Sequence, residues 1–179
     1  MSKVIMDDIG MSKTLKRISH EIIEKNSSLQ DLILVGIKRR GVPLSNRIHD
    51  NIKEFENVDI KTESLDITFY RDDLTKKSEQ PVLNDIDLSI SIDNKKVILV
   101  DDVIYTGRTA RAALDALLNH GRPSSIELAV LIDRGHREIP IKPDYVGKNI
   151  PTSRDEHINV CVKEIDNIDT VYLKKKGGE

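Results

Sequence analysis

A pair of carboxylates followed by a glycine and hydroxyl side chains is the stretch of this sequence best suited to chemistry. Asp101 and Asp102 follow the apolar run 97–100, and a short loop then leads to a helix that we expect to begin near Thr109. If 97–100 is a central strand of a parallel sheet, the loop lies where such sheets bind ligands. Backbone N–H groups in a tight loop, backed by the positive end of a helix, form a site for a phosphate dianion.

The loop and the two carboxylates suit different parts of one ligand. Gly107 allows the backbone to approach closely, and the hydroxyls of Thr106 and Thr109 add hydrogen-bond donors. Asp101 and Asp102 would repel a phosphate, so they call for vicinal hydroxyls or for a metal ion carried by the substrate. A ribose 5-phosphate offers both a phosphate and a diol. The alternative is a helix-capping turn in which the two threonines are caps, and spacing alone leaves both interpretations open.

Apolar spacing predicts the elements that must position this loop. Met11, Leu15, Ile18 and Ile22 recur at spacings of four, three and four, which indicates a helix over 11–22 with one buried face. The other elements expected before the loop are a strand at 32–36 covered on both faces, a helix around Leu44, Ile48 and Ile52, a half-exposed strand at 64–70, and a long polar loop at 71–94.

Beyond the loop the alternation continues. The elements expected there are a helix ending at Gly121, a strand at 126–132, an irregular excursion with three prolines over 133–151, and strands at 157–165 and 169–173. Alternating strands and helices predict an α/β fold, with a mainly parallel twisted sheet flanked by helices on both faces. The length of 179 residues suggests a single domain over 1–179.

Composition narrows the class of protein. Hydrophobic residues make up 38% and charged residues 32% of the chain, which is typical of an ordinary globular protein. No apolar run approaches the roughly 20 residues of a membrane helix, so we expect a cytoplasmic protein. The single cysteine, Cys161, excludes an intramolecular disulfide and a cysteine-built metal site. The formal net charge of −2 gives no overall basic excess, so any nucleic-acid role requires a local patch.

The stretch "VILVDDVIYTGRT" resembles the phosphoribosyl-diphosphate (PRPP) binding motif of type I phosphoribosyltransferases. It has four apolar residues, two acids, two apolar residues, one variable residue, then Thr-Gly and a further Thr. The resemblance implies the fold of that superfamily, with a small hood, expected at about 133–150, and a long flexible loop at about 70–94. Purine-salvage members usually carry a carboxylate where this chain has Tyr105, which argues against a purine substrate.

Other segments resemble one branch of that superfamily. "RISHEI", "LVGIKRRG", "DITFYRDDL", "GRPSSIELAVLIDRGHREIPI" and "DYVGKNIPTS" are similar to segments of the PyrR family, and the likeness weakens only at the two ends and over 84–94. The resemblance implies a UMP-dependent RNA-binding regulator of pyrimidine operon attenuation that also converts uracil and PRPP to UMP and diphosphate. It further implies Mg²⁺ bound with PRPP rather than by the protein alone, a leader mRNA hairpin as partner, and a homodimer or larger homo-oligomer.

The resemblance assigns roles to the nucleotide-site residues. In "GIKRRG" a basic run lies between glycines, which on its own is more typical of a solvated turn, but the family's diphosphate loop occupies this position. A Tyr and an Arg at the start of the long loop are candidates to close over the diphosphate and exclude water. The expected catalytic residues are Asp101, Asp102 and Arg71, and the expected PRPP and UMP contacts are Lys38, Arg39, Arg40, Gly41, Tyr70, Asp101, Asp102, Val103, Ile104, Tyr105, Thr106, Gly107, Arg108, Thr109 and Arg134.

The resemblance also implies an RNA surface formed by the N-terminal helix and the segment past the hood. Each of the ranges 13–25 and 134–148 carries four formal cations against two acids, which alone is typical of solvated surface. Recognition of an RNA hairpin also needs groups that reach splayed bases, and the only aromatic residue near these cations in the sequence is Tyr145. The residues carried over are Lys16, Arg17, His20, Lys25, Arg137, Lys142 and Lys148.

Two rival interpretations remain open. The first is a dedicated salvage enzyme for uracil or another base, which predicts no sequence-specific RNA affinity. The second is a pure regulator whose catalytic loop persists as a UMP sensor, which predicts nucleotide binding without turnover.

Overall fold

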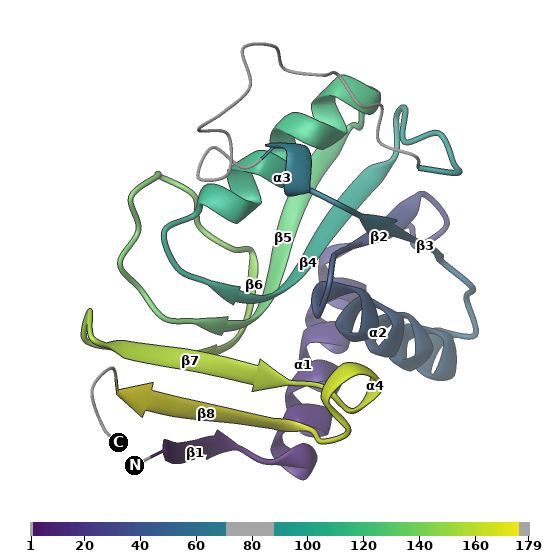
Figure 1. The fold of residues 1–179 in the computed structure, drawn as a ribbon. Coiled ribbons are helices and arrows are strands. Elements are labelled where there is room, and N and C mark those ends of the chain that lie inside the picture. The colour runs from purple at the N-terminus through teal and green to yellow at the C-terminus, as the bar shows by residue number, and fades with distance from the viewer. Residues whose placement is uncertain (1, 71–87, 176–179) are drawn as a thin grey trace, which may run out of the picture.

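The computed structural model describes residues 2–70 and 88–175, and these form two sheets. The larger sheet contains five parallel strands in the order β3-β2-β4-β5-β6, and the smaller sheet has three antiparallel strands in the order β1-β8-β7 (Figure 1). The strands are β1 (Ser2–Met6), β2 (Leu32–Ile37), β3 (Lys61–Leu65), β4 (Lys96–Ile104), β5 (Ser125–Asp133), β6 (Tyr145–Asn149), β7 (Glu156–Cys161) and β8 (Thr170–Lys175). The helices are α1 (Asp8–Lys25), α2 (Gly41–Glu56), α3 (Arg108–His120) and the short α4 (Lys163–Asp166), with a 3₁₀ turn at Thr68–Tyr70.

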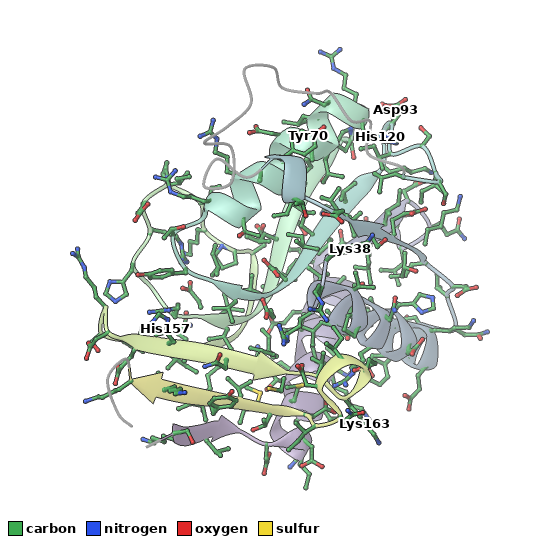
Figure 2. All side chains as sticks on the ribbon, in the orientation of Figure 1. Lys38, Tyr70, Asp93, His120, His157 and Lys163 are labelled. Carbon is green, nitrogen blue, oxygen red and sulfur yellow. The ribbon has the colours of Figure 1, made fainter. Side chains whose placement is uncertain are left out.

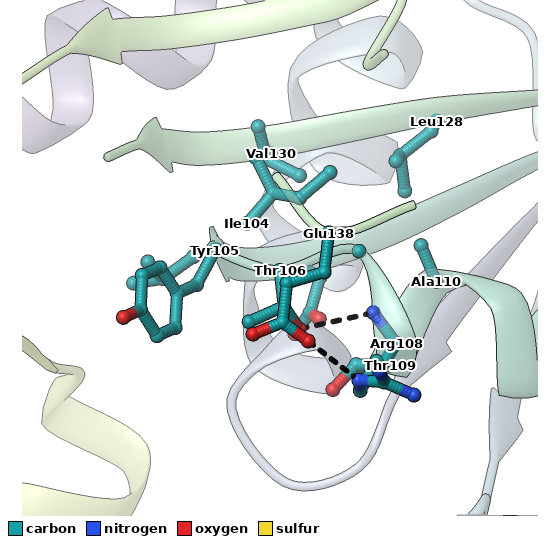
Figure 3. Close-up of a pocket in the computed structure, with 12 residues that line it drawn as sticks. Ile104, Tyr105, Thr106, Arg108, Thr109, Ala110, Leu128, Val130 and Glu138 are labelled. Atoms are coloured by element: carbon teal, nitrogen blue, oxygen red, sulfur yellow. Dashed lines mark hydrogen bonds and ion pairs between the residues drawn. The ribbon is translucent and has the colours of Figure 1, made fainter. Parts of the chain in front are cut away.

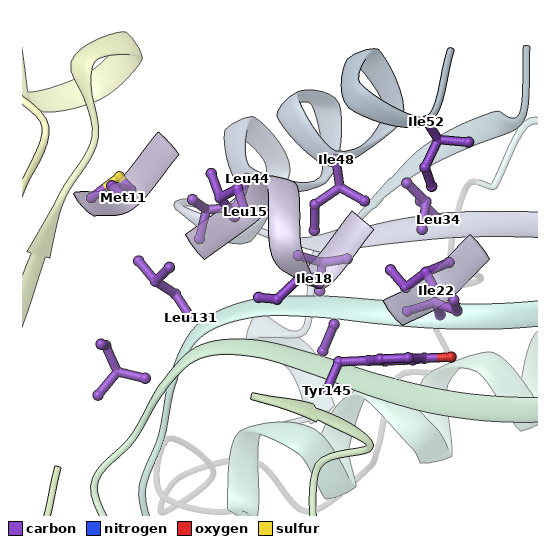
Figure 4. Packing of buried hydrophobic residues seen from close by; sticks show 14 of the residues in the cluster. Met11, Leu15, Ile18, Ile22, Leu34, Leu44, Ile48, Ile52, Leu131 and Tyr145 are labelled. Carbon is purple, nitrogen blue, oxygen red and sulfur yellow. The ribbon is translucent and has the colours of Figure 1, made fainter. Parts of the chain in front are cut away.

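The main sheet has helices on both faces, as the sequence predicts. Helices α1 and α2 cover one face and α3 covers the other (Figure 1). Alternate residues of β4 point to opposite faces, so that Ile98 packs with α1 and α2 while Val97 and Leu99 pack with α3. The predicted spacing of the first helix is confirmed, since Leu15 and Ile18 are buried against this sheet (Figure 4).

Two predicted boundaries are wrong for local reasons, and one strand was not predicted. The strand expected at 64–70 lies instead at β3, because Asp66 Oδ1 accepts hydrogen bonds from the backbone N–H and the hydroxyl of Thr68, at 3.0 and 2.6 Å, and so turns the chain. The strand expected at 157–165 stops at Cys161, and Asp166 Oδ2 then accepts from the Val162 N–H at 2.9 Å across α4. Strand β1 was not predicted, since its pairing partner β8 lies at the far end of the chain.

The irregular excursion predicted over 133–151 ends earlier than expected. Its residues 145–149 form β6, which pairs with β5 at the edge of the main sheet. Gly147 permits this close packing, since a Cβ at that position would lie 2.3 Å from the Leu131 carbonyl oxygen and 2.7 Å from Thr14 Cγ2. The only small antiparallel sheet in the described part of the chain is β1-β8-β7, so the family's hood corresponds to this sheet rather than to 145–149.

The long loop expected at about 70–94 lies largely outside the described residues. Its last part is anchored, since Leu88 and Ile92 are buried on the α3 side of the sheet. Within the described ranges, none of the helices combines the length and the apolar character that crossing a membrane requires.

Candidate functional site

The two aspartates lie in the last part of the central strand. Strand β4 continues to Ile104, four residues beyond the predicted end at Val100. Its pairing with β2 stops at Val100, whereas its pairing with β5 continues through Asp101 to Ile104. The carboxylates of Asp101 and Asp102 therefore come from the part of β4 that extends beyond β2, at the carboxyl edge of the sheet.

The loop after β4 is built to present backbone N–H groups. Gly107 adopts φ 92°, a left-handed conformation that favours glycine, and it precedes α3 directly. The N-cap of α3 is Gly107, without a side-chain cap hydrogen bond, so Thr109 is not a cap, whereas Thr106 contacts the first N–H of the helix. Thr106 Oγ1 accepts only a long hydrogen bond of 3.3 Å from the Arg108 N–H. The first turn of α3 thus keeps N–H groups that an anion can bind.

A cavity of about 360 Å³ opens beside this loop (Figure 3). Arg108 Nε donates to Glu138 at 2.9 Å, and the backbone N–H groups of Glu138 and Ile139 both donate to the Thr106 carbonyl, so the segment after β5 forms one wall. The volume falls in the range of small-molecule sites. The lining residues are Asp101, Val103, Ile104, Tyr105, Thr106, Gly107, Arg108, Thr109, Ala110, Leu128, Val130 and Glu138.

The electrostatics of the acidic pair are unusual. Burial raises the pKa of Asp102, although the neighbouring Asp101, the N–H of Val103 and the nearby charge of Arg40 all oppose the rise. The Val103 N–H donates to Asp102 Oδ1 at 2.8 Å, and the Asp102 N–H donates to Asp101 Oδ1 at 2.9 Å. Desolvated carboxylates of this kind are typical of functional sites.

The basic loop after β2 reaches the same edge of the sheet. Its turn runs from Lys38 to Arg40 and contains a cis peptide between Lys38 and Arg39, and α2 begins at Gly41. A Cβ at Gly41 would lie 2.3 Å from the Val100 carbonyl oxygen and 3.4 Å from Asp101 Cα, so this loop is pressed against the end of β4. The structure therefore brings the predicted diphosphate loop beside the predicted diol contacts.

An acid from the far end of the chain joins the basic loop, and sequence reasoning missed it. Arg40 donates to Asp166 through Nε at 3.1 Å and through Nη2 at 2.8 Å, so that α4 lies next to the first turn of α2 (Figure 2). The Arg40 guanidinium lowers the pKa of Asp166. About two turns after Arg40, Arg47 of α2 pairs with Glu164 and Asp169, both at 2.7 Å. No spacing in the sequence signals these pairs.

Arg134 connects the cavity wall to the small sheet. Its side chain is 5% exposed, and its guanidinium lies 3.9 Å from the centre of the Tyr105 ring. Arg134 also donates to Thr152 Oγ1 at 3.2 Å and to the Glu156 carbonyl at 2.6 Å, at the start of β7. Among the remaining nucleotide-site candidates, Tyr70 lies in the 3₁₀ turn that precedes the long loop, and Arg71 lies outside the described residues.

The two predicted basic segments lie side by side. Arg17 forms an ion pair with Glu21 at 2.5 Å and donates to the backbone carbonyls of Val146 and Gly147, which joins α1 to β6. Lys148, in the same strand, lies 3.5 Å from the Ile5 carbonyl, and it is exposed. Two regions of the chain therefore form one continuous surface.

The other RNA candidates occupy different settings. Lys16 and Lys142 are exposed, and Lys25 forms ion pairs with Glu127 at 3.1 Å and Asp144 at 3.4 Å. Arg137 is turned toward the cavity wall, where it pairs with Asp133 at 2.5 Å and donates to the Tyr105 carbonyl at 2.9 Å.

Tyr145, the aromatic residue nearest to these cations in the sequence, is buried. Its side chain is 2% exposed, and its hydroxyl donates to Glu127 Oε2 at 2.6 Å. This ring is part of the core beneath α1 (Figure 4), so it cannot stack on a nucleotide. Two candidates of this surface contact aromatic rings, since His20 stacks on Phe55 of α2 and Lys25 Nζ lies 5.0 Å from the centre of the Tyr145 ring.

Comparison of the sequence with known protein families identifies the class of this protein. Residues 5–165 match the family model described as "Phosphoribosyl transferase domain", and the fold and the loop after β4 belong to that class. The chain is 56% identical over 173 residues to "Bifunctional protein PyrR" of Clostridium novyi, covering 97% of each protein. It is 53% identical over 178 residues to the protein of the same name from Halalkalibacterium halodurans, covering 98% of this chain and 99% of that one. The chain belongs to the PyrR family.

Solved structures of more distant proteins share the fold. Hypoxanthine phosphoribosyltransferase of Trypanosoma cruzi superposes with a TM-score of 0.73 at 18% identity, covering 97% of this chain and 96% of that one. The hypoxanthine phosphoribosyltransferase of Staphylococcus aureus gives 0.73 at 21% identity, covering 97% and 91%. The predicted type I phosphoribosyltransferase fold is confirmed.

Proposed function

We propose that this protein makes UMP at the site beside β4 and that UMP in this site promotes binding of leader RNA to the α1–β6 surface. As a member of the PyrR family, the chain is a bifunctional regulator of pyrimidine operon attenuation and a uracil phosphoribosyltransferase. The observation that carries the proposal is the loop after Asp101 and Asp102, which leads through Gly107 into the N-terminus of α3, with the basic 38–41 loop against the same strand end.

The three parts of PRPP, its 5-phosphate, its ribose and its diphosphate, contact three different parts of the site. The 5-phosphate takes the N–H groups and hydroxyls of the loop from Thr106 to Thr109, because that loop leads into the positive end of α3. The ribose hydroxyls donate hydrogen bonds to the carboxylates of Asp101 and Asp102, and the diphosphate contacts the basic 38–41 loop. Each ligand group then meets protein groups of complementary charge or hydrogen-bonding capacity.

In the reaction, uracil N1 forms a bond to the anomeric carbon of PRPP while the bond from that carbon to the diphosphate oxygen breaks, and the N1 proton is released. Positive charge develops on the sugar as this bond breaks, as in glycosyl transfer generally. Asp101 and Asp102 stabilise that charge because they place negative potential beside the ribose in a partly desolvated site. Catalysis therefore rests on positioning and electrostatics.

Magnesium fits this site as an ion carried by PRPP. Among the described residues, no group of three or more His, Cys, Asp or Glu side chains is arranged to hold a metal ion. Asp101, which lines the cavity, and the adjacent Asp102 of β4 are the acids that would hold an ion bound to the sugar hydroxyls. When bound, the ion neutralises charge on the diphosphate leaving group.

The choice of base is tested by direct competition. When uracil and hypoxanthine compete for PRPP, we expect UMP and no detectable IMP. The reason is that this chain has Tyr105, whose ring lies against the Arg134 guanidinium, at the position where purine-salvage enzymes usually carry a carboxylate. Product chromatography with both bases in one reaction measures this. Comparable formation of IMP would contradict the assignment of uracil.

We predict that Asp166→Asn raises KM for PRPP about tenfold and leaves KM for uracil unchanged. The substitution removes the charge that holds Arg40 in a bidentate pair, and hydrogen bonds to charged groups contribute about 1.5–3 kcal/mol. Steady-state kinetics with each substrate varied in turn measure the effect. Asp169→Asn is the matched control, since it weakens the Arg47 pair in the same segment without touching the 38–41 loop. An unchanged or lower KM for PRPP in Asp166→Asn would show that Arg40 needs no such positioning.

A further inference from the structure

We propose that His20 and Phe55 form a stacking platform for one unpaired base of the RNA hairpin. This inference rests on the RNA-binding function proposed above and names the place on the surface where a base is read. Recognition of RNA loops depends on unstacked bases that stack on aromatic or imidazole rings. Phe55 lies outside every set of residues that the sequence indicated.

The geometry of the pair is that of a stack. The ring centroids of His20 and Phe55 are 4.2 Å apart, and the ring planes meet at 9°. His20 is exposed and Phe55 is half-buried, so the imidazole is the outer ring of the pair. A base that stacks on the imidazole extends the pair to three parallel rings.

The two helices hold the platform rigidly before any ligand arrives. His20 belongs to α1, and Phe55 belongs to the last turn of α2. The Asn51 amide of α2 donates to Ser19 Oγ of α1 at 3.3 Å, next to the platform. The buried faces of both helices share one core (Figure 4). A preorganised site loses little conformational entropy on binding.

The charges around the platform favour a base over a phosphate. At 100° per residue, Lys13, Lys16 and Arg17 lie on the same outer side of α1 as His20, one turn or two toward its N-terminus. Glu24 lies one turn toward the C-terminus. These cations can follow the RNA backbone, whereas the acid repels phosphate.

Acids on α2 give the platform the same preference. Glu54 and Glu56 flank Phe55, both exposed. Carboxylates accept hydrogen bonds from the amino groups of bases, so these two acids can bind a base edge. They also repel phosphate. The platform therefore takes an uncharged base while the cations toward the start of α1 take the backbone.

The test uses a leader-transcript hairpin of a pyrimidine operon that carries 2-aminopurine at each unpaired purine in turn, titrated with the full chain and UMP. Stacking quenches 2-aminopurine fluorescence, so we expect strong quenching at one position. Phe55→Leu and His20→Ala should remove this quenching and weaken binding about tenfold to a hundredfold, the range for loss of one stacked base. Phe55→Tyr should keep both.

Controls separate the platform from folding and from RNA binding as such. Leu118→Ala, at an exposed leucine of α3, should bind RNA as the wild-type protein does, and every variant should form UMP at the wild-type rate. Wild-type affinity and quenching in Phe55→Leu would overturn the platform, and so would tight binding with no quenched position. A wild-type protein that binds no leader hairpin would instead overturn RNA binding itself.

Discussion

Asp102→Asn is expected to lower kcat/KM for PRPP by about 100-fold to 1,000-fold and, at the same time, to raise the melting temperature of the protein. The first effect follows because Asp102 lies near the carboxyl end of the central strand, next to Asp101 and close to Arg40, where we infer that its carboxylate stabilises the developing positive charge on the sugar. Removing one preorganised electrostatic contact in an active site typically has an effect of this size.

The second effect follows from the direction of the pKa shift. Burial raises the folded-state pKa of Asp102 above its unfolded value. The corresponding stability is fully present below the unfolded pKa and is lost as the pH rises through the folded pKa. At pH 7, which lies above the unfolded pKa, burial of this carboxyl group therefore opposes folding, and a neutral amide relieves this. Each kcal/mol regained raises the melting temperature by about 2–4 °C in a chain of this length.

Paired measurements of UMP formation and thermal melting at pH 7 test this prediction. Asp115→Asn is the control, since Asp115 is an exposed acid of α3 that pairs only loosely with Arg111 at 3.6 Å. A variant at Asp102 that loses stability and activity together would show that the carboxylate has a structural role. Wild-type activity of Asp102→Asn would show that the Asp102 carboxylate has no catalytic role.

Gly41→Ala is expected to destabilise the protein by about 3 kcal/mol or more, at the upper end of overpacking effects, and to abolish PRPP binding. A Cβ at this position would lie 2.3 Å from the Val100 carbonyl oxygen, which is backbone and cannot move aside. Helix α2 would have to withdraw from β4, and the 38–41 loop would move away from the aspartates with it.

Urea unfolding and PRPP titration measure these two effects. Gly10→Ala is the control, because the nearest atoms to a Cβ there are side-chain atoms of Asp7 and Met6, at 3.0 and 3.1 Å, which can shift. Wild-type stability of Gly41→Ala would mean that the start of α2 tolerates displacement from β4.

Sequence reasoning succeeded where the signal is local. The helix over 11–22 was predicted because its apolar residues share one face, and the loop after β4 because its residues follow one another within a single motif. The spacing of Leu44, Ile48 and Ile52 likewise identified α2. Each of these features depends on residues within a few turns or positions of one another.

Sequence reasoning failed where partners come from distant parts of the chain. Strands β1 and β8 pair with each other from opposite ends of the sequence, and Asp166 meets Arg40 across 126 positions. Strand β3 carries Lys61 and Glu63 and pairs only at the sheet edge, so its apolar pattern is weak. The burial of Tyr145 was not visible in the sequence, because it depends on packing against α1.

The central claim is that nucleotide and RNA bind to one protein and that each affects the other. The most direct measurement is the affinity for a labelled leader hairpin with and without saturating UMP, in a preparation that also forms UMP from uracil and PRPP. We predict that UMP tightens RNA binding by about 5-fold to 150-fold, the usual range of coupling between two sites. RNA affinity that UMP leaves unchanged would contradict the account.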